Sequence, residues 1–242
     1  MDVLHDKRAF NVSRALFIRG LGFAAVIGSI GPGRDAASAA TSSVAQPSAD
    51  EAWRRLAAGN KRFATDKGIN CGDNFDRRLE LASGQRPYAI VLACADSRVA
   101  PELVFDQRVG DIFVVRVAGN IADDASIGSI EYAVDHFGSR LLVVMGHEKC
   151  GAVEAAVAAV TDKLHVSGHV AAVVAQIEPA ARSVLDEPGD ILDNAVRAHV
   201  RRVVGELRAA APVLAPAVAA GRLRGVGVRY ALGDGYVSTI SA

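Results

Sequence analysis

Three short, mostly apolar runs constrain the fold of this chain more than any other feature of its sequence. They are Tyr88–Ala93, Ile112–Val117 and Leu141–Met145, which lie between glycine, proline or charged residues. Short runs of this kind, without regular polar alternation, are typical of strands that are buried on both faces of a parallel sheet. The chain is therefore expected to contain a sheet with layers of structure on both sides.

Helical patterns fall between and after these runs. Ser126–Phe137 separates the second run from the third, and three more helical segments follow the third run: Ala152–Val160, Val170–Leu185 and Asn194–Ala210. An alternation of strands and helices predicts an α/β fold with a mostly parallel central β-sheet flanked by helices.

Two further segments are expected at the ends of this core. Asp50–Thr65 has acidic residues at its start and apolar residues, including Trp53 and Phe63, near helical spacing, which predicts an N-terminal helical arm. Leu223–Tyr230 and Tyr236–Ile240 flank a Gly-Asp-Gly turn and predict a closing pair of strands.

The first forty residues have the three parts of an export signal. Basic residues, among them Arg14 and Arg19, accompany the apolar segment Leu16–Ile30, and small residues that include Ala37 and Ala39 follow. The apolar segment is shorter than the roughly 20 residues of a membrane span, so no stable span is predicted. A buried N-terminal helix is the alternative.

These boundaries give a prediction for the whole chain. Residues 1–40 are expected to be an export signal peptide, residues 41–49 a linker and residues 50–242 a single catalytic domain. Ser13–Arg19 resembles a twin-arginine signal, with Ala15 where the second arginine is expected. The protein is therefore expected to be periplasmic or otherwise exported.

The composition excludes several classes of protein. There are 27 basic and 27 acidic residues, and half of the chain is hydrophobic, which excludes a disordered chain. No excess of positive charge is available to neutralise phosphates, so no nucleic-acid partner is expected. Three cysteines are too few for a disulfide scaffold; one of them, Cys71, lies in a polar segment and is expected at the surface.

Candidate metal ligands follow two of the predicted strands. Cys94 comes directly after the first run, and His147 and Cys150 come after the third. The carboxyl ends of neighbouring parallel strands meet at one edge of a sheet, where ligands bind. Two thiolates and one imidazole suit a tetrahedral zinc ion whose fourth position is open for catalysis. A disulfide between Cys94 and Cys150 is the alternative, and each residue alone could be purely structural.

Asp96 and Arg98 lie close to the first candidate ligand. They are on the same side of an extended segment, so the guanidinium can hold the carboxylate in a bidentate pair. Asp96 could fill the fourth position on zinc, or, held by Arg98, could accept a hydrogen bond from a zinc-bound water. Two thiolates cancel the charge of zinc, so the ion acidifies water less strongly and a carboxylate acceptor is useful there.

These residues lie in the first and the last of four segments: Cys94–Val99 (CADSRV), Phe113–Asn120 (FVVRVAGN), Gly128–His136 (GSIEYAVDH) and Val143–Val153 (VVMGHEKCGAV). In order and spacing they resemble the β-class carbonic anhydrases, from about Trp53 to the C-terminus. The resemblance implies zinc held by Cys94, His147 and Cys150 and a gate formed by Asp96 and Arg98.

The same resemblance implies an activity and an assembly. The activity is the reversible hydration of CO2 to bicarbonate and a proton, in which zinc hydroxide attacks CO2. The implied partners are CO2 and bicarbonate, together with further copies of the chain in a homodimer or higher homo-oligomer. The N-terminal helix with Trp53 and Phe63 is expected to pack on a partner subunit.

Three more site residues rest on the resemblance. Tyr132 and His136 share a helix face and fall where plant-like members have a tyrosine and a histidine implicated in proton relay; a core aromatic is the alternative for Tyr132. Gln107 lies close to the glutamine that contacts substrate in those members. Val91 stands where regulated members have a tryptophan, so an open site is expected, with Asp96 on zinc only in a closed state.

Two rival functions remain at the level of sequence. One is the hydrolysis of another small linear molecule, such as carbon disulfide, on the same fold. The other is a non-enzymatic zinc- or thiol-based binding protein. The pair of Asp96 and Arg98 argues against the second, because a structural zinc site needs a fourth protein ligand and no gate.

Overall fold

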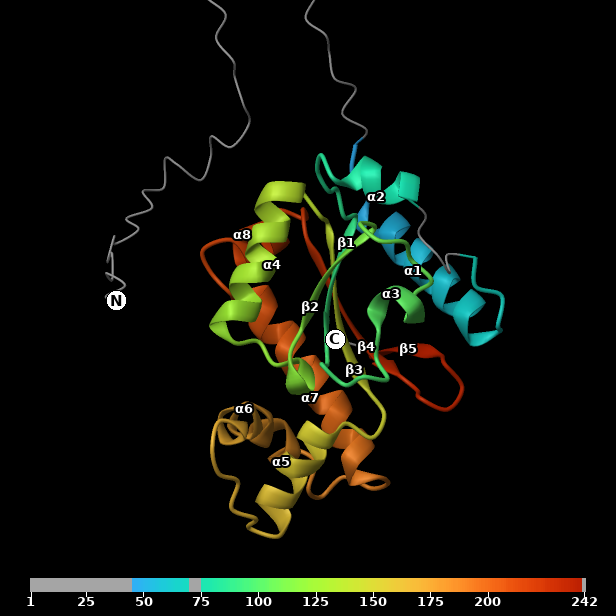
Figure 1. Cartoon of the computed structure of the whole chain (residues 1–242). Coiled ribbons are helices and arrows are strands. Elements are labelled where there is room, and N and C mark those ends of the chain that lie inside the picture. Colours follow the sequence, from blue (N-terminus) through green and yellow to red (C-terminus); the bar gives the residue numbers. More distant parts are fainter. Residues whose placement is uncertain (1–44, 70–74, 241–242) are drawn as a thin grey trace, which may run out of the picture. The chain divides into compact units, whose positions relative to one another are not determined.

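The structure is a computed structural model that describes residues 45–69 and 75–240 (Figure 1). The predicted signal peptide, residues 41–44 of the predicted linker and Cys71 lie outside the described residues. Everything described belongs to one compact unit, Val44–Ala242. Among the helices in residues 45–69 and 75–240, none combines the length and the apolar character that crossing a bilayer requires.

In the described part of the chain, five strands form one sheet in the order β2-β1-β3-β4-β5. They are β1 (Ala89–Ala93), β2 (Ile112–Arg116), β3 (Leu141–His147), β4 (Arg224–Tyr230) and β5 (Val237–Ile240). The first four are parallel, and β5 pairs antiparallel with β4. The structure thus confirms the predicted mostly parallel sheet and its closing pair of strands.

Successive residues of β1 alternate between two hydrophobic clusters, one on each face of the sheet. Val91 and Ala93 of β1 belong to the cluster on the α1 side, whereas Ile90 and Leu92 belong to the cluster under α4, α7 and α8. Both sets are fully buried, which explains why this run shows no polar alternation. Figure 1 shows α1 on one side of the sheet and α4, α7 and α8 on the other.

The helices occupy most of the predicted places. Their bounds are α1 (Ala49–Ala64), α2 (Phe75–Leu81), α3 (Pro101–Val104), α4 (Asp124–Phe137), α5 (Gly151–Thr161), α6 (Val170–Arg182), α7 (Ile191–Ala209) and α8 (Leu214–Ala219), with a 3-10 turn, η1, at Ala118–Asn120. The short elements α3, α8 and η1 were not predicted, because helices of three to six residues are too short to show a hydrophobic period.

The N-terminal helix packs on the sheet of its own chain. The Ser48 hydroxyl caps α1 by accepting from the Glu51 N–H at 3.2 Å. Ala52 and Leu56 are fully buried in the cluster on this side, and Trp53 and Phe63 lie partly buried against it. The two aromatic rings, expected against a partner subunit, therefore already contact the core of their own chain.

Candidate metal centre

The parallel register brings the three candidate ligands to one edge of the sheet. Ala93, the last residue of β1, pairs with Met145 of β3, so Cys94 and the end of β3 lie at the same level. His147 closes β3, and Cys150 is the residue that precedes α5. The local sequence places these side chains at carboxyl ends, and the crossover topology makes those ends neighbours.

One ligand atom from each of Cys94, His147 and Cys150 lies within 4.8 Å of the others. The two sulfur atoms are 4.0 Å apart and both thiols are free, so the alternative of a disulfide is not realised. Two sulfurs at about 2.3 Å from one tetrahedral ion are about 3.8 Å apart. The observed spacing therefore fits a shared ion.

The hydrogen bonding of His147 gives an independent indication that this cluster binds a metal. His147 is fully buried, and its Nδ1 lies 2.9 Å from the carbonyl oxygen of Glu148. A carbonyl only accepts, so Nδ1 carries the hydrogen and Nε2 presents a bare lone pair. Nε2 has no hydrogen-bond partner among the described residues. A buried, unpartnered acceptor beside two thiols fits a metal ligand.

The two thiols differ in their affinity for a proton. The Sγ of Cys94 accepts hydrogen bonds from the backbone N–H of Gly119 at 3.3 Å and of Asp96 at 3.4 Å. The contact with Cys150, the neighbouring His147 and these amides lower the pKa of Cys94 well below its usual value, although burial opposes the shift. The pKa of Cys150 is raised by its bond to Cys94 and by burial. The site therefore favours a thiolate at Cys94.

Asp96 is engaged by Arg98 through both carboxylate oxygens. Nε donates to Oδ1 at 2.9 Å and Nη2 donates to Oδ2 at 2.6 Å, while the Arg98 backbone N–H adds a bond of 2.9 Å to Oδ1. These bonds hold the pKa of Asp96 well below its usual range. Oδ2 is also 3.9 Å from Nε2 of His147, so the ionised carboxylate adjoins the ligand cluster.

Arg116, at the end of β2, is a residue that the sequence reasoning missed. Its Nε donates to the carbonyl oxygen of Cys94 at 3.0 Å, and its Nη2 donates to that of Asp96 at 2.7 Å. One guanidinium thereby fixes the backbone at the first ligand and two residues after it. A charged residue in an otherwise apolar strand was the available signal.

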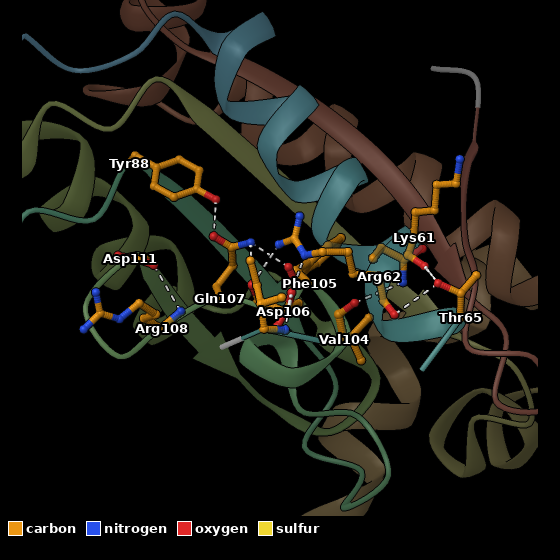
Figure 2. Close-up of polar contacts among 12 residues, drawn as sticks. Lys61, Arg62, Thr65, Tyr88, Val104, Phe105, Asp106, Gln107, Arg108 and Asp111 are labelled. Atoms are coloured by element: carbon orange, nitrogen blue, oxygen red, sulfur yellow. Dashed lines mark hydrogen bonds and ion pairs between the residues drawn. The ribbon is translucent and has the colours of Figure 1, made fainter. Parts of the chain in front are cut away.

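Gln107 lies in a different set of contacts. Its Oε1 accepts from the Tyr88 hydroxyl at 2.6 Å, and its Nε2 donates to the carbonyl oxygens of Phe105 at 2.6 Å and Asp106 at 3.1 Å. Figure 2 shows the amide between the Tyr88 ring and the loop that follows α3. Both the oxygen and the nitrogen of the Gln107 amide are therefore hydrogen-bonded within the chain, and these bonds stabilise the loop.

Tyr132 and His136 form a pair of their own on α4. Their rings stack with centroids 4.1 Å apart, and Tyr132 also contacts Phe113 at the start of β2. Phe113 pairs with Ile90, four residues before Cys94, which is about 13 Å along a strand. Within one chain the pair therefore lies away from the ligand cluster, which the sequence did not predict.

Comparison with known proteins gives a consistent assignment. A family model described as carbonic anhydrase matches residues 89–237. Carbonic anhydrase 2 of Mycobacterium tuberculosis (strain CDC 1551 / Oshkosh) is 42% identical over 184 residues, covering 76% of this chain and 89% of that protein. The carbonic anhydrase of Mycolicibacterium smegmatis is 40% identical over 186 residues, covering 77% and 90%.

Solved structures agree with these relatives. The β-carbonic anhydrase CcaA is 26% identical, with a TM-score of 0.60 over 78% of this chain and 95% of that one. A structure from Sordaria macrospora, described as a tetrameric β-carbonic anhydrase, shares the fold with a TM-score of 0.64 at 24% identity, over 79% of this chain and 98% of that one. Family model, relatives and fold together establish that the chain belongs to the β-carbonic anhydrase family of enzymes.

Proposed function

We propose that this chain catalyses the reversible hydration of CO2 to bicarbonate and a proton at a zinc ion held by Cys94, His147 and Cys150. The observation that supports the metal site most directly is the convergence of two buried sulfurs on the bare, unpartnered Nε2 of His147. Zinc bound there supplies a Lewis acid that makes water nucleophilic at neutral pH. The remaining tasks fall to side chains of the protein.

Asp96 serves as the acceptor that orients the reacting water. Its carboxylate stays ionised because Arg98 donates to both oxygens, and an ionised carboxylate has lone pairs left to accept a further hydrogen bond. Arg98 in addition donates to the Lys149 carbonyl oxygen at 3.3 Å, which connects the Asp96–Arg98 pair, here called the dyad, to the loop between β3 and α5. The dyad keeps the fourth position open, since a carboxylate held by Arg98 is withdrawn from the ion.

Substitution of Asp96 tests this role. Asp96→Asn should keep zinc bound, since Asp96 is not one of the three ligands, and should lower kcat for CO2 hydration about 10²-fold, because the reacting water is no longer held in the right orientation. Asp186→Asn removes the same charge from an exposed position and should behave as wild type. Stopped-flow CO2 hydration and zinc content are measured on the same samples. A wild-type protein with full zinc and no hydration would refute the proposed reaction.

The proton relay assigned to Tyr132 and His136 requires a second subunit. Within one chain this pair packs beside the start of β2, so direct exchange with Asp96 is not possible there. Exposed apolar side chains on α2 and α3, among them Phe75, Leu79 and Leu103, suit an interface between copies of the chain. We infer a homodimer or higher homo-oligomer. Light scattering that shows only monomer at micromolar protein concentration would overturn the proposed homo-oligomer.

The export signal is a separate proposal. Residues 1–40 have the basic, apolar and small-residue parts of a signal peptide in order. Cell fractionation followed by N-terminal sequencing tests it: export predicts a shortened chain outside the cytoplasm, and a full-length cytoplasmic chain contradicts it.

A further inference from the structure

We propose that His199 is a positioning residue for the metal centre, acting on Cys94 through the backbone of Gly119. The inference rests on the proposed zinc site and assigns a function to a buried histidine that neither the sequence pattern nor the proposed mechanism used. His199 lies on α7, about one hundred residues after the ligand that it influences.

His199 is buried on a helix face that is otherwise apolar. It is 1% exposed, and its neighbours on that face, Val196, Val200 and Val203, are buried in the core. Its Nε2 lies 2.8 Å from the carbonyl oxygen of Gly119, which can only accept, so Nε2 carries the hydrogen. Burial lowers the pKa of His199 to about 4, so the ring is neutral at pH 7 and Nδ1 carries no hydrogen.

Gly119 links this histidine to the thiolate. It lies in the turn η1 at a φ of 68°, and a Cβ atom there would come within 2.6 Å of Ile177 Cδ1 and 3.1 Å of Ala152 Cβ. Only glycine fits both the backbone conformation and the space. The Gly119 N–H donates to the Cys94 Sγ at 3.3 Å, while the carbonyl of the same residue accepts from His199.

The two bonds are coupled because they share one residue in a tight turn. A buried carbonyl without a donor is costly, so loss of the His199 bond favours rotation of the turn toward another partner. Such a rotation also turns the Gly119 N–H away from the sulfur. A hydrogen bond to a thiolate withdraws electron density from it, and loss of such supporting contacts typically costs 10- to 100-fold in metal affinity.

Cobalt substitution gives a readout that a purely structural role of His199 would not move. In the full chain loaded with Co2+, the sulfur-to-cobalt charge-transfer band reports electron donation by the Cys94 and Cys150 thiolates. We compare wild type with His199→Leu, which has no donor, and with His199→Gln, whose amide N–H can reach the same carbonyl. Val203→Ala on the same helix is the matched control, because it removes buried volume without touching Gly119.

The expected result is a shifted charge-transfer band and at least 10-fold weaker zinc binding, by chelator competition, for His199→Leu. His199→Gln should restore both to near wild type, and Val203→Ala should change neither. If His199→Leu does not fold, His199→Asn replaces it, since its amide is too short to reach.

Three results would overturn the inference: a wild-type band and affinity in the donor-less variant, equal impairment of the glutamine variant, or the same shift in Val203→Ala. Failure of the wild-type chain to bind zinc or cobalt would instead refute the proposed metal site itself.

Discussion

Replacement of glycine by alanine should destabilise the fold at Gly59, where α1 closely approaches the loop after α3. The same replacement should stabilise the fold at Gly205 in α7. Gly59 lies in the interior of α1 and is buried, whereas Gly205 lies in the interior of α7 and is exposed. A Cβ atom at Gly59 would come within 1.8 Å of the Phe105 carbonyl oxygen and 2.8 Å of Gln107 Nε2. A Cβ atom at Gly205 would meet no atom within 4 Å.

The magnitudes follow from these distances. Replacement of glycine by alanine in a helix interior stabilises by about 1 kcal/mol where space allows, which is the expected gain at Gly205. At Gly59 the obstacle is backbone, so helix or loop must move by more than an ångström, and overpacking of this kind costs about 1–3 kcal/mol or more. Opening the bond between Gln107 and Phe105 costs about 1 kcal/mol in addition. After subtraction of the helix-propensity gain of about 1 kcal/mol, the net expectation is a loss of about 1–3 kcal/mol.

Urea unfolding followed by circular dichroism measures both variants. All samples are compared at one protein concentration, with the oligomeric state checked by light scattering, because association contributes to apparent stability. Gly59→Ala should move the midpoint to lower urea, and Gly205→Ala should move it to higher urea, both with an unchanged m-value. A Gly59→Ala protein as stable as wild type would refute the inferred contact between α1 and the loop.

Two further predictions concern groups around the ligands. The pKa of His199 is about 4 in the folded chain and 6.5 when unperturbed, so the unfolded chain binds the proton at a higher pH than the folded chain does. The free energy of unfolding therefore falls as the pH is lowered, by about 2 kcal/mol between pH 7 and pH 5. Urea midpoints across that range should fall less steeply for His199→Gln; equal slopes would contradict the assignment. Arg116→Lys keeps the charge but cannot serve two carbonyl oxygens with a fixed fork, so chelator competition should show about 10-fold weaker zinc binding. Affinity equal to wild type would show that the ligand loop holds its shape without Arg116.

The strands were predictable because their signal is local. Tyr88–Ala93 is apolar throughout since both faces of β1 are covered, and the structure begins that strand at Ala89. The convergence of Cys94, His147 and Cys150 was predictable for a related reason. Parallel strands that are neighbours end at the same edge, so residue type and strand position together indicate the cluster.

Other placements could not be predicted from local patterns. The spacing of Tyr132 and His136 correctly predicts a shared helix face, but it does not say which end of the sheet that face adjoins. Gln107 has the residue type of a substrate contact, yet its amide is used by Tyr88 and by its own loop. The positions of these three side chains depend on how α4 and the loop after α3 pack against the sheet.

The sequence by itself determined the fold class, the order of strands and helices along the chain and the residues able to hold a metal, because hydrophobic pattern and donor chemistry are properties of short segments. The tertiary structure decided that the Gly119 N–H reaches the Cys94 sulfur, that Arg116 binds the backbone of the ligand loop and that His199 donates to the Gly119 carbonyl oxygen. Hydrogen bonds depend on distances of a few tenths of an ångström. Those distances are set only when helices and loops far apart in the chain pack together.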